Sequence, residues 1–426
     1  MSGVDEIRAP PPVDSTTDRP RHGQPTSELH LEDQSPGDRS FQVDEEPPKH
    51  SREPVNHARH AAKPSHLLIQ LYIISHLTLF SLLGTLARLG IQWVTTYPGA
   101  PVTISVLWAN IGGSYVMGFL SEDRRLFQFP THLSKPSMST SDRKALHSKH
   151  KKTIPLYIGL ATGFCGSFTS FSSFIRDAFL ALSNDLPASL YHPVVPGVPS
   201  PRFSSTHPRN AGYSLPALLA VLITEPALSL SALYVGAHTA LLLDKYTPSL
   251  PASASRVLDP LAIPLGLGAW LATMLIAIFP TNSDWRGEVL FALVFAPLGT
   301  LIRYFVSLQL NPRAKSFPVG TFAVNILGSA VLGMAWDLQR VRIGGIPGGG
   351  VVGCQVLQGI EDGFCGCLTT VSTWVAEIQG LRRGHAYRYA LVSVGVGLAT
   401  MVVVMGSVRW SVGWETPVCV TGRTSV

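Results

Sequence analysis

The amino-acid sequence contains an internal repeat, in which three motifs occur twice in the same order. Residues 84–88 read Gly-Thr-Leu-Ala-Arg, and residues 299–303 read Gly-Thr-Leu-Ile-Arg. In both copies an asparagine follows the arginine after 22 residues, at the start of Asn-Ile-x-Gly-Ser-x-Val-x-Gly. A third motif, Gly-Phe-Cys-Gly, opens residues 163–174 and 363–374. An internal repeat determines the architecture, so this feature constrains the fold more than any other.

The repeats are apolar, which indicates a membrane protein. The chain is 46% hydrophobic and only 14% charged. Its apolar runs are long enough to cross a bilayer, which takes about 20 helical residues each. Nine such runs are predicted, at approximately residues 67–94, 103–120, 155–180, 213–243, 258–280, 286–310, 317–337, 354–378 and 387–410. We therefore expect an all-α integral membrane protein with nine transmembrane helices.

The order of these runs predicts how the chain is divided. Runs one to four are repeated by runs six to nine, and the fifth run has no partner. An odd span between two equal halves turns the second half upside down, so we expect two inverted four-helix repeats joined by a linker helix. The predicted segments are a disordered tail at 1–64, the first repeat at 65–245, the linker transmembrane helix at 246–284, the inverted second repeat at 285–411 and a C-terminal tail at 412–426.

The N-terminal segment, residues 1–64, differs in composition from the rest. It holds 12 of the 27 acidic residues, is rich in Pro, Ser and His, and has almost no apolar run. Such a segment cannot bury enough apolar surface to offset its ordering entropy, and it lacks the apolar core of a signal peptide. We expect it to be disordered.

The basic residues predict the orientation in the membrane. Loop 121–154 carries eight Lys and Arg residues, and the loops expected on the opposite side carry fewer. By the positive-inside rule the N-terminus is cytosolic and the C-terminus extracellular. The net charge of +6 then reflects topology, and we expect no nucleic-acid partner.

The residues of the predicted spans give no sign of an enzyme. The five cysteines, Cys165, Cys354, Cys365, Cys367 and Cys419, form neither a zinc spacing nor an even disulfide framework. No paired carboxylates, metal-binding histidine pair or nucleophile motif stands out. Glu225 is the most deeply placed carboxyl group. It fits either a proton relay or a local pairing beside Pro226, and we favour the local pairing.

The first two motifs place polar side chains inside apolar spans. Asn110 and Asn325 each offer two N–H donors. A single asparagine would be read as a contact between helices, but two at matched positions favour a role in a pathway. Arg88 and Arg303 either reach the interface or pair with helix carbonyls, and we favour structural anchoring.

The third motif predicts a broken helix in each repeat. Glycines loosen the helix, and the hydroxyls that follow can satisfy freed backbone groups, which a membrane interior permits only where protein or water covers them. Two such breaks would expose carbonyl oxygens to a small cation. Beyond the first break, Phe171 and Phe174 share a helix face with Ser170 and Ser173. Aromatic ring edges are positive, so rings and hydroxyls together form a wall that suits an anion.

The three motifs closely resemble those of the Fluc/FEX (CrcB-type) fluoride channels. The bacterial members are four-span proteins that pair as antiparallel dimers, whereas the eukaryotic members resemble this chain, with two units fused through an extra span. The resemblance covers about residues 67–410. It implies a fluoride-selective channel in the plasma membrane that exports fluoride passively, working as a monomeric pseudo-dimer with fluoride and the lipid bilayer as its partners.

The resemblance also implies roles for single residues. The fluoride pores would be lined by Asn110, Asn325, Phe171, Phe174, Ser170, Ser173, Thr370, Thr373 and Trp374. A central structural Na⁺ would be held by the backbone carbonyls of Gly166, Thr169, Gly366 and Thr369.

The second repeat departs from the family pattern at Val371 and Trp374, where the family has phenylalanine. In the family each pore takes one phenylalanine from each half, which here pairs Phe171 with Trp374 and Phe174 with Val371. We expect the two pores to be unequal, with the better one containing Phe171. Two alternative functions remain, a proton-coupled anion exchanger that uses Glu225 and a membrane scaffold that transports nothing.

Overall fold

The computed structural model describes residues 65–127 (with gaps at 98, 99, 101 and 103), 139–186, 211–280, 282 and 285–419. The tail predicted at residues 1–64 lies outside this range. The described chain is mostly helical, as predicted. Its strands are β1 (Arg342–Ile343) and β2 (Ile346–Pro347), which form a short antiparallel hairpin.

The first repeat has four helical regions, of which the third is interrupted. They are α1 (His66–Thr95); α2 (Leu107–Glu122); the series α4 (Pro155–Ile158), the π-helical η2 (Gly159–Cys165), α5 (Gly166–Phe168) and α6 (Phe171–Leu182); and α7 (Ser214–Leu242), preceded by the short η3 (Ala211–Tyr213). A further helix, α3 (Thr140–Lys151), lies in the basic loop after α2.

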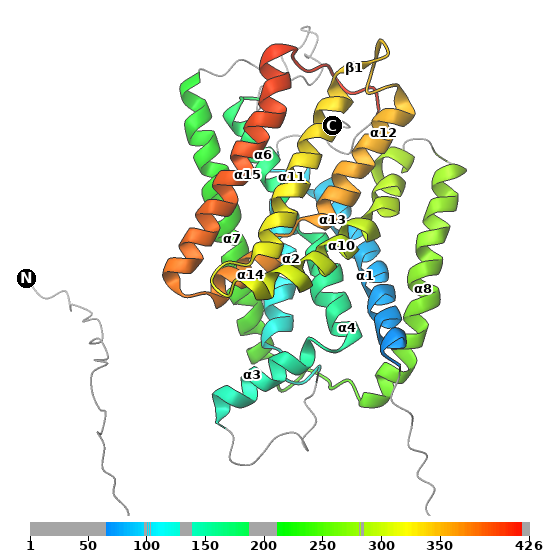
Figure 1. Ribbon diagram of the computed structural model, residues 1–426, viewed down its shortest axis with the longest axis vertical. Helices are drawn as coiled ribbons and strands as arrows, with labels where there is room; N and C mark the ends of the chain where they lie inside the picture. Colours follow the sequence, from blue (N-terminus) through cyan, green and yellow to red (C-terminus); the bar gives the residue numbers. More distant parts are fainter. Residues whose placement is uncertain are drawn as a thin grey trace, which may run out of the picture. The chain divides into compact units, whose positions relative to one another are not determined.

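The second repeat has the same organisation and follows a single long helix, α8 (Ala252–Ile278). Its regions are the π-helical η4 (Arg286–Leu290), α10 (Phe291–Leu310) and η5 (Asn311–Arg313); α11 (Val319–Arg340); the series α12 (Val351–Gly359), the π-helical η6 (Ile360–Cys365), α13 (Gly366–Leu368) and α14 (Ser372–Gly380); and α15 (Arg383–Ser411). Figure 1 shows α11 and α15 running beside each other.

Seven helices of the described chain are long and apolar enough to cross a membrane. Two of the predicted runs, 103–120 and 354–378, are not among them. The first forms α2, which has 16 residues. The second is divided by its break and carries Glu361 and Asp362. A multi-pass membrane protein is therefore confirmed.

Close helix packing explains the glycines of the Gly-Thr-x-x-Arg motif. A Cβ atom at Gly84 would collide with the carbonyl oxygen of Phe164, and one at Gly299 would collide with that of Phe364. Only glycine lets α1 and α10 approach the interrupted third helices this closely. The motif thus fixes the same contact in both repeats.

The second segments of the interrupted helices pack across the two repeats. The α6 segment of the first repeat packs against α11 and α15, and the α14 segment of the second repeat packs against α2 and α7. Helix α8 packs against α1, where His76 Nε2 lies 3.6 Å from a carboxylate oxygen of Asp259. The centre of the molecule is therefore built from both repeats.

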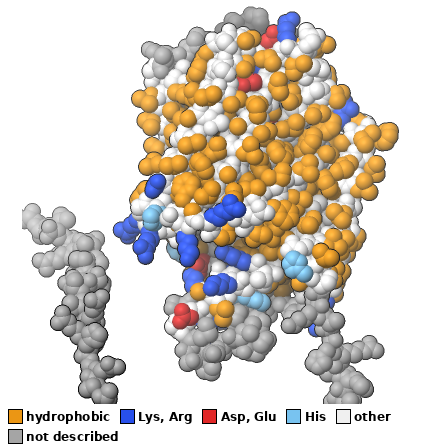
Figure 2. All heavy atoms as spheres, viewed as in Figure 1, with side chains coloured by type: hydrophobic (Ala, Val, Ile, Leu, Met, Phe, Trp, Pro, Cys, Tyr) orange, Lys and Arg blue, Asp and Glu red, His pale blue; other side chains and the backbone are white. Residues whose placement is uncertain are grey.

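The outer surface matches the polarity of a membrane. Figure 2 shows a broad face covered by hydrophobic side chains, with Lys and Arg near the end where Figure 1 places α3. Large apolar side chains are widely exposed, among them Trp93 (72%), Leu242 (77%) and Phe279 (77%). Exposed apolar surface of this extent favours contact with lipid.

Lys151, at the end of α3, closes the C-terminal end of α2. Its ammonium group donates to the carbonyl oxygens of Leu120, Ser121 and Asp123 at 2.8, 2.9 and 3.0 Å. The last carbonyls of a helix lack helical partners, and a cation satisfies them. Burial lowers the pKa of Lys151 from 10.5 to about 8, although Asp123 and Glu122 act in the opposite direction.

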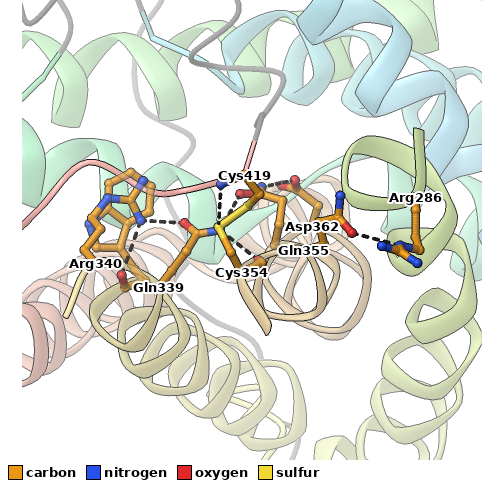
Figure 3. Close-up of a disulfide and its surroundings, with 9 residues drawn as sticks. Arg286, Gln339, Arg340, Cys354, Gln355, Asp362 and Cys419 are labelled. Carbon is orange, nitrogen blue, oxygen red and sulfur yellow. Dashed lines mark hydrogen bonds between the residues drawn. A yellow bond between two sulfur atoms is a disulfide. The ribbon is translucent and has the colours of Figure 1, made fainter. Parts of the chain in front are cut away.

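One expectation about the cysteines was wrong, because Cys354 and Cys419 form a disulfide (Figure 3). The two residues are 65 positions apart, and their Cα atoms lie 5.8 Å apart. The sequence spacing did not reveal the pair because α14 and α15 separate its members along the chain. Cys165, Cys365 and Cys367 are buried free thiols.

The segment that ends at Cys419 is held against the end of α11. The Glu415 N–H donates to the Arg340 carbonyl at 2.9 Å, and the Trp414 indole N–H donates to Asp337 at 2.9 Å. Gln339 Nε2 donates to the Cys354 carbonyl at 3.2 Å. These contacts and the disulfide fasten residues 412–419 to the second repeat.

Candidate functional site

Both repeats contain a helix break with nearly the same geometry. Helix α5 ends at Phe168, and Thr169 is extended, with φ −97° and ψ 153°. Helix α13 ends at Leu368, and Thr369 is extended, with φ −97° and ψ 156°. The third motif therefore breaks its helix in both copies, as its glycines and hydroxyls indicated.

The two asparagines bind the backbone at these breaks. Asn110 Oδ1 accepts a 2.9 Å hydrogen bond from the N–H of Ser170, and Asn325 Oδ1 accepts one of 2.9 Å from the N–H of Thr370. In a continuous helix these N–H groups would donate to the carbonyls four residues earlier. Both asparagines are completely buried. They replace the missing helical partners and hold the breaks open.

The two breaks are also bonded to each other. The N–H of Ser372 donates to Thr169 Oγ1 at 3.1 Å, and the N–H of Ser172 donates to Thr369 Oγ1 at 3.1 Å. Each threonine thus caps the helix that begins in the other repeat. Sequence reasoning missed Ser172 and Ser372, because their partners lie about 200 residues away in the chain.

Arg88 and Arg303 lie buried against the breaks. Arg303 donates to the carbonyl oxygens of Cys367 at 2.7 Å and Thr162 at 2.9 Å, and Arg88 donates to that of Asp362. Both guanidinium groups therefore pair with backbone carbonyls, and Arg88 and Arg303 each contact the other repeat.

The glycines of the break are required by these arginines. A Cβ atom at Gly166 would collide with the guanidinium of Arg303, and one at Gly366 would collide with that of Arg88. A larger residue at either position would displace an arginine from its carbonyl partners.

The backbone at the breaks fits a small hard cation. The asparagine contacts divert the N–H groups of Ser170 and Thr370, which leaves the carbonyls of Gly166 and Gly366 without their usual helical donors. Thr169 and Thr369, in extended conformation, turn the chain three residues after these glycines. Carbonyl oxygens are ligands that suit a hard cation such as Na⁺.

The aromatic residues of the motif meet at the centre of the core. The ring centroids of Phe171 and Trp374 lie 5.4 Å apart in an edge-to-face contact, and those of Phe171 and Phe174 lie 5.6 Å apart. All three side chains are at most 1% exposed. The Trp374 indole N–H has no acceptor among the described residues. Val371, buried in the same cluster, offers no ring edge.

The hydroxyl residues beyond the breaks cap the helices that follow. Ser170 Oγ accepts from the N–H of Ser173 at 3.2 Å, and Thr370 Oγ1 accepts from the N–H of Thr373 at 3.3 Å. The four residues lie directly after the breaks, at matched positions.

A cavity of about 170 Å³ opens beside the second break. It is lined by Thr162, Arg303, Tyr304, Ser307, Leu308, Thr370 and Thr373. Asn325 Nδ2 donates to the backbone carbonyl of Thr370 at 3.3 Å, so the cavity adjoins the residue that this asparagine binds.

Each repeat also holds a carboxylate at a matched position, which the three motifs did not indicate. Asp177 and Glu377 follow Thr169 and Thr369 by eight residues in each repeat. Asp177 accepts from the N–H and the hydroxyl of Ser105 at 3.0 and 2.8 Å, just before α2. Their matched spacing was the signal that could have revealed them.

Glu377 binds the start of the corresponding helix of the second repeat. It accepts from the hydroxyls of Thr321 on α11 at 2.7 Å and of Tyr389 at 2.8 Å, and from Asn311 at 3.2 Å. The two carboxylates therefore fix the ends of the helices that carry Asn110 and Asn325.

The local pairing favoured for Glu225 was also wrong. Its carboxylate accepts from Nδ2 of Asn110 on α2 at 3.0 Å. The contact joins α7 to α2, and a sequence pattern along α7 alone could not indicate it.

Comparison with known proteins identifies the family. The family model described as CrcB-like protein, Camphor Resistance (CrcB), matches residues 76–195 and again residues 290–407. The chain belongs to this family. The two matches lie within the two repeats, and the resemblance drawn from the motifs is confirmed.

Several curated relatives carry functional names. Fluoride export protein 1 of Neurospora crassa is 52% identical over 389 residues, which cover 84% of this chain and 70% of the relative. The protein of the same name from Candida albicans is 34% identical over 78% of each chain. The fluoride-specific ion channel FluC of Escherichia coli is 35% identical over 102 residues, which are 24% of this chain and 73% of FluC. No solved structure matches significantly.

Proposed function

We propose that this protein is a fluoride-selective channel that exports fluoride passively across the plasma membrane. The names of its fungal and bacterial relatives support this activity. The two family repeats and the apolar helices support a channel that a single chain builds as a pseudo-dimer.

The observation that carries the proposal is the unpartnered indole N–H of Trp374 beside the edge of Phe171. A buried N–H without an acceptor is destabilising by roughly 1–3 kcal/mol, unless a ligand accepts from it. A ring edge carries partial positive charge. Together the two groups favour a small desolvated anion.

Polar residues of the second repeat would line the route of fluoride to Trp374 and Phe171. Fluoride would enter the cavity at Arg303, pass the hydroxyls of Thr370 and Thr373, and reach the amide of Asn325. It would then pass Phe171 and Trp374. Hydrogen-bond donors along a narrow path replace the water that fluoride loses, and a larger anion such as chloride fits such a path poorly.

The second path is proposed to be much weaker. By the family pattern, the path beside Asn110 would pair Phe174 with Val371. Val371 directly precedes α14, the segment that packs against α2 and α7. Valine provides neither a ring edge nor a donor. Ser170 and Ser173 would line this weaker path.

A structural Na⁺ is proposed at the centre. The carbonyls of Gly166, Thr169, Gly366 and Thr369 would hold it, and its charge would stabilise the two breaks when bound. The asparagines keep the carbonyls of Gly166 and Gly366 available, because they take the N–H groups of Ser170 and Thr370.

The proposed topology has nine spans in two inverted repeats, with the N-terminus cytosolic and the C-terminus extracellular. Helix α2 and the interrupted region α12–α14 would add two spans to the seven long helices, which makes nine. The Cys354–Cys419 disulfide supports an extracellular C-terminal end, because disulfides persist in oxidising compartments.

The membrane potential suffices to drive export. Fluoride enters a cell as its neutral weak acid, ionises near neutral pH and is trapped as the anion. A negative interior then favours outward movement of the anion by about 2.3 kcal/mol per 100 mV. The channel therefore needs no energy-coupling domain.

A growth experiment tests the function in cells. Expression of the protein in a fluoride-sensitive yeast strain should restore growth in millimolar fluoride, whereas an Asn325→Ala, Phe171→Ile variant at equal membrane abundance should not. Equal growth of cells with the protein and cells with an empty vector would support the scaffold alternative instead.

A further inference from the structure

Glu225 makes a contact that the channel mechanism does not require. Its side chain is 1% exposed, and Oε2 accepts from Nδ2 of Asn110 at 3.0 Å. The other carboxylate oxygen, Oε1, has no partner among the described residues. A carboxylate therefore accepts from an N–H of the Asn110 side-chain amide. In the second repeat the matched residue is Asn325, whose amide we propose donates to fluoride.

The repeat shows which residue stands at this position in the other half. A Cβ atom at Gly118 on α2 would meet Leu233 on α7, and one at Gly333 on α11 would meet Val404, Met405 and Met401 on α15. Counting back eight residues from Gly118 and Leu233 pairs Asn110 with Glu225, and counting back eight from Gly333 and Met401 pairs Asn325 with Ser393.

Ser393 is completely buried, like Glu225, and its hydroxyl has no partner among the described residues. Asn325 therefore faces a small hydroxyl residue where Asn110 faces a carboxylate. The two repeats therefore differ in charge at this position. Both asparagines accept a backbone N–H at the break through Oδ1, but Asn110 Nδ2 donates to Glu225 whereas Asn325 Nδ2 donates to the Thr370 carbonyl.

We propose that Glu225 acts as a tethered anion that occupies Asn110 and closes its path to fluoride. When the carboxyl group is ionised, it repels a second anion strongly, because charges are poorly screened in a protein interior. The proposal rests on the proposed function and explains why the path with Val371 is closed even though its asparagine is retained.

The decisive experiment moves the carboxylate to the other repeat. Fluoride efflux from liposomes would be measured for purified Ser393→Glu and Ser393→Gln, two variants of equal side-chain size. We expect the glutamate variant to conduct about tenfold or more below the glutamine variant, because only glutamate adds an anion beside Asn325. Equal efflux by the two folded variants would overturn the proposal.

The reverse experiment removes the carboxylate from the Asn110 path. In a Phe171→Ile, Val371→Phe background, the main path is blocked and the ring edge of the second is restored. Adding Glu225→Ser should raise efflux about tenfold. Efflux of the background with Glu225 still present, or no gain in a triple variant that elutes as a single folded species, would overturn the proposal.

The wild-type protein separates this inference from the proposed function. If wild-type liposomes release no fluoride, the channel function itself is wrong. If wild-type liposomes release fluoride, but Ser393→Glu and Ser393→Gln conduct equally and Glu225→Ser gives no gain, only the proposed role of Glu225 is wrong.

Discussion

The indole N–H of Trp374 is buried without an acceptor among the described residues, and it is the donor that we propose binds fluoride. Trp374→Phe keeps the ring edge toward Phe171 and removes this N–H. A lost hydrogen bond to an anion costs about 1.5–3 kcal/mol, so we expect fluoride efflux to fall by at least about tenfold. Trp108→Phe is the matched control, since Trp108 is 41% exposed on α2. Wild-type efflux from the Trp374→Phe protein would remove this N–H from the pathway.

The inequality of the two paths is tested at positions 171 and 371. Phe171→Ile should abolish most fluoride efflux, because it removes the ring edge that packs against Trp374. Val371→Ala should leave efflux nearly unchanged, because valine contributes neither edge nor donor. Efflux lost at Val371 and retained at Phe171 would reverse the assignment of the main path.

Asn110 and Asn325 could be singled out from the sequence, because the repeat places each of them at the same distance from the neighbouring motifs. Their contacts could not be, because Ser170 and Thr370 approach them only once the helix breaks. Glu225 was noticed as the most deeply placed carboxyl group, but its contact was not predicted, because its partner Asn110 lies on a different helix.

The helix break is the element on which the site depends. Gly366→Val should abolish folding or fluoride efflux, since its side chain would collide with the Arg88 guanidinium. Thr169→Ser should be mild, because serine keeps the hydroxyl that accepts from Ser372. Size-exclusion profiles and efflux would check both variants. A fully active Gly366→Val protein would count against the arginine-filled break and the proposed Na⁺ site.

The cap on α2 predicts a dependence of stability on pH. Burial lowers the pKa of Lys151 to about 8, so between about pH 8 and 10.5 the unfolded state binds more protons than the folded state. The stability contributed through this group therefore rises with pH across that window and is constant below it. Thermal unfolding in detergent at pH 7.5, 8.5 and 9.5 should show this rise in the wild type.

The matched variant for this test is Lys151→Met, which has no ammonium group to titrate. The rise should be reduced in it by comparison with the wild type. Parallel pH profiles of the two proteins would contradict the assignment to Lys151.

The elements followed from sequence to different degrees. The break was predictable because glycines and hydroxyls gather within residues 163–174 and 363–374. The π-helical segments η2 and η6 just before the breaks were not, because an apolar run reads alike for α- and π-helical backbone. Helix α3 was also unforeseen, since it lies within a polar, basic loop and has no apolar periodicity.

At the scale of the whole molecule, the repeat and its unpaired linker predict opposite locations for the two ends. A tag at the N-terminus should be inaccessible on intact cells, and a tag after Val426 should be accessible. Permeabilised cells provide the control for both tags. Two ends on the same side would require an even number of spans and would contradict the inverted arrangement.

The sequence predicted the two repeats and the membrane location, because motif spacing indicates the first and local composition the second. It did not predict how the repeats interlock. The Thr169–Ser372 and Thr369–Ser172 contacts and the Cys354–Cys419 disulfide join residues that are distant in the chain, and they depend on the packing of complete helices. Long-range pairing of this kind becomes visible only in the folded molecule.

The most direct test of the channel function is fluoride efflux from liposomes that contain the purified protein and no other component. With a potassium gradient and valinomycin to set the potential, we expect rapid release of fluoride, little release of chloride and the same rate with or without a pH gradient. Release that requires a pH gradient would indicate a proton-coupled exchanger, and no release of fluoride would contradict the account.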